Sequence, residues 1–515
     1  MKKLISLILV ALLALSLAAC GNKDIPAAAE GGQGSTLTYG SGDYTAINPA
    51  LFEHGEINLL LFAGLTRHDA ENKVVPDVAE KWEFDAASCT YTFCLREDVF
   101  FHDGQRLTSK DVKFTLEAIM DPANASENAS NYEDILSIET PDDFTVKIKL
   151  AAPNVAMLDY LSMGILPAHL LEGKDLATDA FNQNPVGAGP YRLSAWDMGQ
   201  SITLVKNEKY HFGAPKIHTI VFKIVEDSSV RALQVKSGEL SLAQVTPEDA
   251  KSFEGGKFAV YDMATADYRG ILYNFNSAFF GKHRELPGIL SYAIDREAIV
   301  DTVLKGQGEA AYSPLQKGPY HNPDIEKFEY NPAKAAELLE AAGWQKGGDG
   351  IYEKGGEKLR FVIHNGQGDQ VRIDMSNICA QQLRELGADV TVSVDAEVDW
   401  AGQDAYLIGW GSPFDPDDHT YKVFGTEKGA NYSGYSNPQV DELLKAARES
   451  DDEVERKELY AAFQEELTRD MPYTFLAYVD AVYVANPTVS GITQDTVLGH
   501  HGVGIFHNVA EWEIG

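Results

Sequence analysis

The sequence predicts a multidomain α/β fold, and its length, its composition and the order of its segments all indicate this class. At 515 residues the chain is several times the usual domain length of about 100 to 200 residues. Apolar residues make up 44% of it and charged residues 23%, which is close to ordinary globular composition and excludes a disordered or fibrous chain. Strand-like and helix-like segments alternate along the chain, as in layered α/β proteins and unlike a helical bundle or a β-sandwich.

Strands are predicted where apolar side chains alternate with polar ones or form short apolar runs between turn residues. Residues 91–96 and 144–150 show the alternation that is typical of strands with one buried face. The apolar runs 359–363, 390–394 and 405–410 lie between helical patterns. This order favours strands that are covered by helices.

Helices are predicted from their start and stop signals. Thr108 and Asp111 resemble a capping box, the apolar stripe that follows has helical spacing, and Pro122 ends the segment. An Asn-Pro pair starts a second helix over 331–343, which a glycine stops. Another Asn-Pro pair starts the helical region 437–472.

The charge balance narrows the range of partners. Lys and Arg number 43 and Asp and Glu number 77, which gives a formal net charge of -34 at pH 7. Such a negative charge repels the phosphate backbone of a nucleic acid. It also removes the counterion release that drives most nucleic-acid binding. We therefore expect no nucleic acid among the partners.

The first residues resemble a secretory signal followed by a lipidation site. A positively charged start precedes the apolar stretch 4–19, which is too short to span a membrane comfortably. The Leu-Ala-Ala-Cys-Gly sequence at 17–21 resembles a bacterial lipobox. We expect residues 1–19 to be a signal peptide, Cys20 to carry the lipid, and 20–35 to be a flexible tether at the extracytoplasmic face of the cell membrane. The alternative is an ordinary cleavage site beside a chance cysteine.

Common catalytic motifs are absent from the sequence. It contains no Gly-x-Ser-x-Gly elbow, no phosphate-binding loop, no His-Glu-x-x-His helix and no Cys-x-x-Cys pair. The glycine-rich segment 187–190 contains a proline and precedes no helical pattern, so we interpret it as a turn. Cys89 and Cys94 fall on opposite faces of a predicted strand, about 16 Å apart, too far for a disulfide. We expect neither an enzyme nor a cofactor, and a secreted hydrolase that uses the carboxylates of 415–418 is a remote alternative.

A polar segment at the end of a predicted strand is the first candidate binding site. Residues 415–419 include Asp415 and Asp417 but lack the glycine and the terminal glutamate of a calcium-binding loop. Trp410 and Phe414 come directly before them, and aromatic side chains can wall a pocket. The alternative interpretation is a solvated or capping loop.

Histidines supply the second candidate. Most of the 13 histidines are scattered singly, but His500 and His501 are adjacent between two glycines, and His507 is nearby. His54 lies close to the N-terminus. Imidazole is a usual ligand of nickel, copper and zinc. A lone histidine is more often an ordinary surface or core group, so both interpretations stay open.

Several motifs together resemble one family of proteins. The blocks that carry the resemblance are 76–84, 91–96, 101–104, 185–191, 293–296, 331–344 and 435–438. They are similar to the extracellular solute-binding proteins of family 5, which are the receptors of peptide and nickel ABC importers. The resemblance covers nearly everything from Leu37 to the C-terminus.

The resemblance implies a two-lobed, type II periplasmic-binding-protein fold with an extra N-terminal subdomain. Lobe I would comprise 36–269 plus 479–515, with the subdomain at about 64–185, and lobe II would comprise 270–478. The lobes would close on a ligand by a hinge motion. The implied partners are the ABC permease and ATPase subunits, with the lipid anchor holding the receptor, expected to be a monomer, at the membrane.

The resemblance also implies candidate ligand contacts. Peptide-binding members have an aspartate shortly after the Gly-Trp of this strand, where it accepts the peptide's α-amino group, but here Pro413 takes that place. Asp415 or Asp417 could replace it. The run 410–416 is similar to that of nickel-binding members, and by this similarity Trp410 and Phe414 line the pocket.

Two ligands remain open on these grounds. We expect capture of oligopeptides or dipeptides, with a nickel or nickel–histidine chelate as the alternative. The arginine clamp of one nickel receptor type has no counterpart in 121–135 or 161–170. Another nickel receptor type holds the metal through histidines near both ends of the chain, and His54 with His500 or His501 would fit that arrangement.

Overall fold

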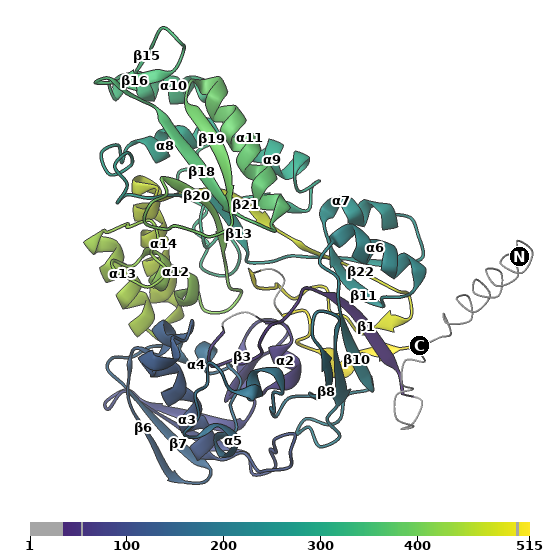
Figure 1. The fold of residues 1–515 in the computed structure, drawn as a ribbon. Helices are drawn as coiled ribbons and strands as arrows, with labels where there is room; N and C mark the ends of the chain where they lie inside the picture. The colour runs from purple at the N-terminus through teal and green to yellow at the C-terminus, as the bar shows by residue number, and fades with distance from the viewer. Residues whose placement is uncertain (1–33, 53–54, 501–503) are drawn as a thin grey trace, which may run out of the picture. The chain divides into compact units, whose positions relative to one another are not determined.

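Two large mixed sheets organise the molecule (Figure 1). The computed structural model describes residues 34–52, 55–500 and 504–515. The predicted signal peptide, Cys20 and most of the tether lie outside the described residues, as do His54 and His501. Within the described part of the chain, no helix is long and apolar enough to cross a membrane.

The first sheet has seven strands in the order β12-β22-β11-β1-β10-β9-β8. Strand β1 pairs in parallel with β10 on one side and with β11 on the other. Segments far apart in the sequence therefore form the centre of the sheet. The bounds are β1 Thr36–Ser41, β8 Tyr191–Asp197, β9 Ser201–Lys206, β10 Thr219–Ile224, β11 Leu242–Val245, β12 Ala259–Met263 and β22 Ala481–Ala485, with helices α6 Ser228–Ser237 and α7 Pro247–Ala250 beside them.

The second sheet has six strands in the order β14-β21-β13-β20-β18-β19. The three apolar runs predicted as strands are confirmed as β18, β19 and β20. Nearly every residue of β20 is buried, as expected for a central strand covered by helices. The bounds are β13 Tyr268–Tyr273, β14 Gly308–Ala310, β18 Arg360–Gly366, β19 Asp389–Asp395, β20 Ala405–Trp410 and β21 Tyr473–Val479.

Helices cover this second sheet, and the predicted start signals form their caps. The Asn331 side chain accepts a hydrogen bond from the backbone N–H of Lys334, and Asn437 accepts one from Gln439. The helices are α8 Leu286–Ser291, α9 Arg296–Thr302, α10 Pro332–Ala341, α11 Gln370–Leu386, α12 Asp417–Phe424, α13 Pro438–Glu449 and α14 Glu453–Asp470. A small sheet packs at the far end, with β15 Gln345–Lys346, β16 Tyr352–Lys354 and β17 Glu357–Lys358.

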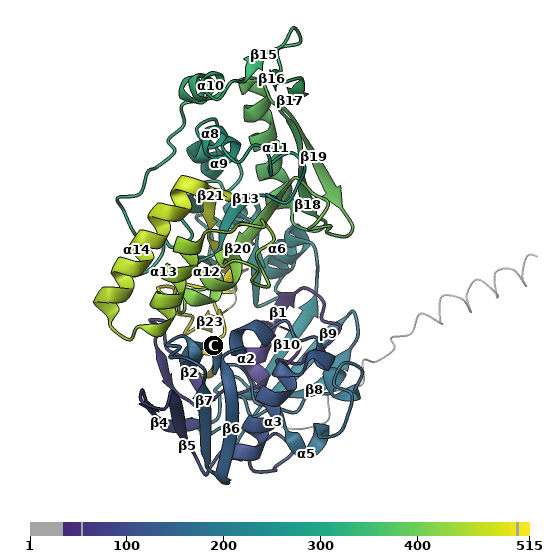
Figure 2. The ribbon, with the colours of Figure 1, turned by 90° about the vertical axis from the view of Figure 1, so that its left-hand side faces the viewer.

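A four-stranded antiparallel sheet, in the order β4-β5-β7-β6, forms a separate layer seen in Figure 2. Its helix α3 begins with the predicted capping box of Thr108 and Asp111. The bounds are β4 Ala79–Asp85, β5 Thr90–Leu95, β6 Ile135–Asp142, β7 Thr145–Leu150 and α3 Ser109–Met120. Short elements complete this region and the tail, namely α2 Asn58–Leu61, α4 Met157–Tyr160, α5 Ala168–Leu171, β2 Thr66–His68, β3 Val74–Pro76, β23 Val489–Ser490 and β24 Glu513–Ile514.

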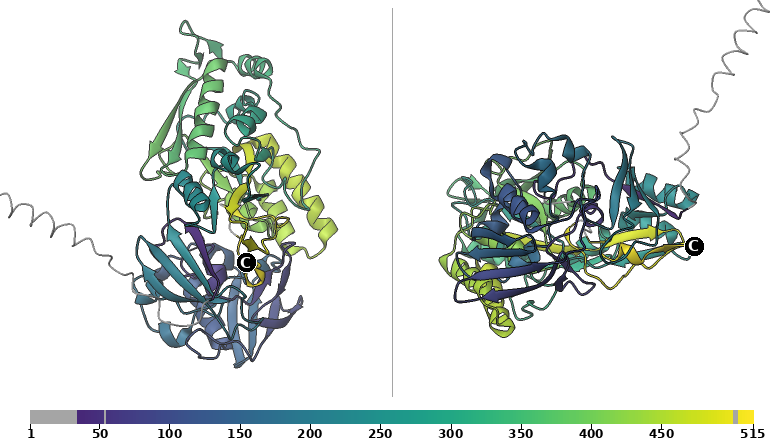
Figure 3. Two further views of the ribbon diagram at one scale, coloured as in Figure 1. Left: turned by 90° about the vertical axis from the view of Figure 1, so that its right-hand side faces the viewer. Right: turned by 90° about the horizontal axis from the view of Figure 1, so that it is seen from below.

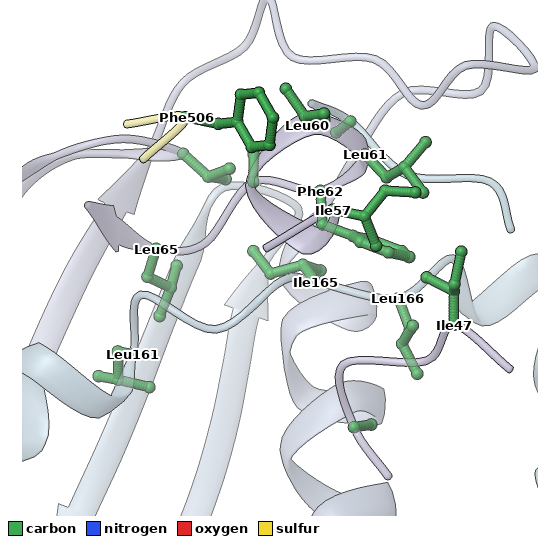
Figure 4. Close-up of a cluster of buried hydrophobic side chains, with 14 of the residues drawn as sticks. Ile47, Ile57, Leu60, Leu61, Phe62, Leu65, Leu161, Ile165, Leu166 and Phe506 are labelled. Atoms are coloured by element: carbon green, nitrogen blue, oxygen red, sulfur yellow. The ribbon is translucent and has the colours of Figure 1, made fainter. Parts of the chain in front are cut away.

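Each large sheet has its own apolar core. One core takes buried side chains from Leu37 to Met263 and from Ala481 to Trp512, and the other takes them from Tyr268 to Tyr478. Figure 4 shows part of the first core, where Phe506 of the C-terminal tail packs near Leu60 of α2.

The chain passes between the two sheets twice, through 264–267 and through Asp480. Figure 3 shows the C-terminal tail returning to the first sheet. The boundaries predicted at 269/270 and 478/479 fall inside β13 and β21 and stay predictions. Below, lobe I denotes the part around the first core and lobe II the part around the second.

The glycine-rich segment 187–190 precedes strand β8 and not a helix. A Cβ atom on Gly187 would lie 1.9 Å from the carbonyl oxygen of Leu61. The glycine therefore permits a close approach of two backbone segments. Cys89, Cys94 and Cys379 are free thiols among the described cysteines.

Candidate binding site

Three cavities lie near the end of β20 and the start of α12, one around Trp410, one around Phe414 and one beside Asp417 and Arg448. We call the first the Trp410 cavity, and it has a volume of about 290 Å³. It is lined by Arg372, Trp400, Tyr406, Ile408, Gly409, Trp410, Gly411, Asp418, His419, Lys422, Tyr432 and His500. All of these except His500 belong to lobe II, so the C-terminal tail of lobe I closes one side.

Aromatic rings form a wall of the Trp410 cavity. Trp400 stacks on Tyr432 with ring centroids 4.1 Å apart and planes at 8°. Tyr432 also stacks against Trp410 at 6.2 Å. The Lys422 ammonium lies 5.9 Å from the Trp410 ring. Trp410 therefore lines a cavity, as the sequence predicts, and its contact with a ligand stays a prediction.

His500 is held in a defined orientation in the same cavity. Its Nδ1 lies 2.7 Å from a carboxylate oxygen of Asp267, and its Nε2 lies 3.4 Å from Nη2 of Arg372. Burial lowers the pKa of His500 below its usual value, and the charge of Asp267 opposes that shift only in part. A neutral ring donates its Nδ1 proton to Asp267 and turns the Nε2 lone pair toward Arg372.

Alternating charges support this arrangement. Asp267 also pairs with the buried Arg269. Asp369 lies 3.0 Å from Nε of Arg372 and 4.0 Å from Nη2 of Arg269. The two guanidinium groups and the two carboxylates balance, so burying them here does not leave an uncompensated charge.

Gly411 joins this site to the first connection between the lobes. It has φ of +149°, and a Cβ atom on it would lie 1.8 Å from the carbonyl oxygen of Ala266. Its own carbonyl accepts a hydrogen bond of 3.1 Å from the backbone N–H of His500. The end of β20, the connection 264–267 and the tail residue His500 are thus packed together.

Phe414 lies in a different cavity from Trp410. This second cavity, the Phe414 cavity, has a volume of about 330 Å³ and is lined mainly by lobe I. The Phe414 ring stacks on His68 with centroids 3.6 Å apart, and His68 is within 2.9 Å of the Asp159 carboxylate. Asp418 lines both cavities, so the two aromatics, although close in sequence, face neighbouring spaces.

Asp415 and Asp417 are engaged in buried ion pairs. Asp415 pairs with Arg456 at 2.8 Å, and burial raises the pKa of the Asp415 carboxyl while Arg456 opposes the shift. Asp417 pairs with Arg448 at 2.6 Å, and its side chain has no exposed surface. These contacts show a structural use of both carboxylates, and the ligand contact expected of them stays a prediction.

The other predicted histidines are not brought into this arrangement. His54 and His501 lie outside the described residues, and His507 lines the Phe414 cavity with Nδ1 3.0 Å from the Gly504 carbonyl oxygen. Across the described part of the chain, no cluster of three or more His, Cys, Asp or Glu side chains could hold a metal ion. A metal that arrives with its own organic ligands does not need such a cluster.

Arg372 and the aromatic residues Trp400, Tyr406 and Tyr432 were missed by sequence reasoning. Arg372 lies in the first turn of α11 after the cap residue Asp369. The segments 121–135 and 161–170, where the resemblance places a clamp arginine, belong to lobe I, whereas this guanidinium comes from lobe II. Only the cap signal at Asp369 marked the start of this helix in the sequence.

The two large sheets have separate cores and are joined by two short connections, and cavities lie beside these connections. This architecture defines a two-lobed binding protein. The sequence matches the family described as bacterial extracellular solute-binding proteins, family 5 middle, over residues 73–432. The chain belongs to this family. Its members are extracytoplasmic transport binding proteins and not enzymes.

Individual relatives agree with this assignment. The chain is 32% identical to the oligopeptide-binding protein AppA of Bacillus subtilis, over 90% of this chain and 91% of the relative. A crystal structure of NikZ from Campylobacter jejuni in complex with Ni(L-His) is 35% identical, with a TM-score of 0.87 over 93% of this chain and 99% of that chain. The structure of the Bacillus subtilis AppA with a nonapeptide has a TM-score of 0.82 at 30% identity, over 94% and 99%.

Proposed function

We propose that this protein is the substrate-binding subunit of an ABC importer and that it captures a small metal chelate bearing a carboxylate, such as nickel–histidine. The observation that carries the proposal is the placement of His500 and Arg372 side by side in the Trp410 cavity. The imidazole of His500 is a type of group that binds metals, and the guanidinium of Arg372 is a type of group that binds carboxylates. A chelate of an amino acid presents both a metal and a carboxylate.

His500 has the surroundings of a metal-binding histidine. Metal-ligating histidines almost always donate their second ring N–H to a carboxylate, a carbonyl or water, which fixes the tautomer. Asp267 supplies that carboxylate at 2.7 Å. A metal would then bind the other ring nitrogen, Nε2, in place of its contact with Arg372, and imidazole suits nickel.

Arg372 provides the matching site for a carboxylate. Its guanidinium is planar and can donate two parallel hydrogen bonds to one carboxylate. On binding, the metal would take the Nε2 lone pair of His500 and the ligand's carboxylate would take Arg372. The cavity of about 290 Å³ is at the small end of ligand pockets, which favours an amino-acid-sized ligand. The likeness to the Ni(L-His) complex of NikZ supports this choice.

Peptide capture is the second candidate, and the Phe414 cavity favours it. Its lining extends over many more residues than that of the Trp410 cavity and includes the apolar side chains of Phe52, Leu59 and Phe506. Asp418 lines both cavities, and its side chain is 26% exposed, so it is a more accessible partner for a peptide amino group than the buried Asp417. The likeness to the Bacillus subtilis AppA, which is named as an oligopeptide-binding protein and has a structure with a nonapeptide, supports this alternative.

The lipid anchor and the importer partners belong to the same proposal. Cys20 would carry the lipid and the tether would keep the binding protein near its permease at high effective concentration. The connections 264–267 and Asp480 would act as the hinge between open and closed forms. The protein would work as a monomer in this cycle.

Titration calorimetry tests the choice of ligand. Purified protein would be titrated with nickel plus L-histidine, with nickel alone, and with a pool of short peptides. We expect binding of nickel with histidine, and a loss of about 100-fold or more in affinity for His500→Ala, because a direct ligand is worth at least as much as the partners that orient it. His169 offers a matched control, since it also contacts a carboxylate, Asp103, at 2.7 Å but lines none of the three cavities. If only the peptides give a heat of binding, the ligand is a peptide and the proposed chelate binding is wrong.

A further inference from the structure

We infer that the lobes carry a second junction, apart from the hinge, that holds them closed without any ligand. We call this junction the latch and define it by Arg448, Asp417, Tyr160 and Asp134, with the Lys428–Glu133 ion pair at its edge. Figure 1 shows its elements, α12 and α13 of lobe II and α4 of lobe I, at the left of the ribbon, with the hinge strands nearer the centre.

Arg448 is the centre of the latch. Its Nη2 lies 2.6 Å from Asp417 in its own lobe, and its Nη1 lies 3.0 Å from Asp134 of lobe I. Its main chain also crosses between the lobes, because its carbonyl oxygen accepts a hydrogen bond of 3.0 Å from the backbone N–H of Val155. The Arg448 side chain is only 7% exposed.

Tyr160 makes the complementary contact from lobe I. Its hydroxyl donates a hydrogen bond of 2.6 Å to Asp417. Burial raises the pKa of Tyr160 well above its usual value, so the hydroxyl keeps its proton and remains a donor. At the edge, the Lys428 ammonium of lobe II lies 2.6 Å from Glu133 of lobe I.

The Arg448–Asp417 pair lies within lobe II and would survive opening, but the contacts that cross between the lobes would break together. These run from Arg448 to Asp134 and Val155, from Tyr160 to Asp417 and from Lys428 to Glu133. Hydrogen bonds to charged groups contribute more than neutral ones, and a buried charge that loses a partner is costly until water reaches it. None of Arg448, Asp417, Tyr160 and Asp134 lines the Trp410 cavity, so a chelate bound there would leave the latch contacts in place. The apparent affinity of a binding protein scales with the populated fraction of its competent state, so the latch would raise the affinity without touching the chelate.

Spin-label distances measured without ligand test the latch. Labels at Glu139→Cys in lobe I and Lys445→Cys in lobe II, in a Cys89→Ser, Cys94→Ser background, report the separation of the lobes by double electron–electron resonance. We expect one short distance in the parent protein. We expect a longer component in the Glu133→Gln, Asp134→Asn variant, whose closed-to-open ratio should fall by about tenfold or more. Tyr160→Phe should shift the distribution in the same direction.

The matched control removes an ion pair inside one lobe. Lys216 and Glu513 are 2.6 Å apart and both belong to lobe I, so Glu513→Gln should leave the distances unchanged. The inference is overturned if the ligand-free parent protein already shows mainly the long distance. It is equally overturned if both latch variants give the parent distribution. Neither result depends on the identity of the ligand, so the proposed chelate binding is tested separately.

Discussion

Trp410 and His500 are far apart in the sequence but line one cavity. Close main-chain contacts of a single residue, Gly411, bring their two segments together. The close approach of Gly411 to Ala266 sets the end of β20 beside the hinge connection. The backbone N–H of His500 then bonds to Gly411. The aromatic signal at Trp410 and the Gly-His-His-Gly signal were readable in the sequence, but their meeting depends on a main-chain contact that no periodicity encodes.

Arg372 should discriminate the chelate from other ligands. Replacing Arg372 by Lys keeps the positive charge but removes the two parallel donors that match a carboxylate. We expect the affinity for nickel–histidine to fall by about tenfold or more, since one charge-assisted hydrogen bond is lost. Calorimetry measures this change. Arg384→Lys, on the same helix, loses a bond to the Val390 carbonyl outside the cavity and should leave the affinity unchanged; equal losses in both variants would argue against a role for Arg372 in binding.

At the scale of elements, sequence reasoning was most successful where local signals are strong. The capping box of α3, the Asn-Pro starts of α10 and α13, and the apolar strand β20 are all confirmed. The central pairing of β1 with β10 and β11 could not be predicted in this way. Strand pairing over such sequence distances is decided by tertiary packing, and local propensity does not encode it.

Gly411→Ala should damage both the element and the site. The added methyl group would collide with the Ala266 carbonyl oxygen at a φ of +149°. We expect the free energy of unfolding to fall by more than about 2 kcal/mol, and chelate affinity to fall as well, because Trp410 moves. Urea denaturation measures the first effect. A Cβ atom on Gly348 would have no neighbouring atom within 4 Å, so Gly348→Ala serves as the control, and a Gly411 variant as stable as this one would contradict the close approach.

Asp480, the connection between β21 and β22, should give the stability a pH dependence. Burial, and then the nearby Asp262, raise its pKa from 3.8 to about 6. The folded state therefore holds a proton that the unfolded chain releases at lower pH, and the contribution to stability is full below about pH 4 and lost as the pH rises through about 6. Asp480→Asn should remove that part of the slope and stabilise the protein above pH 6 by about 1 to 2 kcal/mol, allowing for solvent screening.

Thermal unfolding midpoints of both proteins between pH 4 and 8 check this expectation. Other titrating groups affect the parent and the variant alike, so the difference between the two curves isolates Asp480. Parallel curves over the whole range would show that its ionisation costs nothing in the folded state.

At the scale of the whole molecule, two cores and two crossings fit a protein that closes on a ligand. The sequence predicted α/β layers from its patterns, whereas the two-lobed architecture came from the resemblance of its motifs to family 5. The placement of Trp410 and Phe414 in separate cavities could not be predicted, because the irregular backbone between them decides which way each ring faces. The ligand-binding role of the predicted residues stays a prediction until a ligand is located.

The most direct test is a crystal structure of the protein grown with nickel and L-histidine, with data collected at the nickel absorption edge. We predict an anomalous peak in the Trp410 cavity at about 2.1 Å from Nε2 of His500, the length of a bond between zinc and an imidazole nitrogen. The histidine carboxylate should lie within hydrogen-bonding distance of Arg372. A cavity without nickel, or a metal bound elsewhere with peptide density in the Phe414 cavity, would contradict the proposed function.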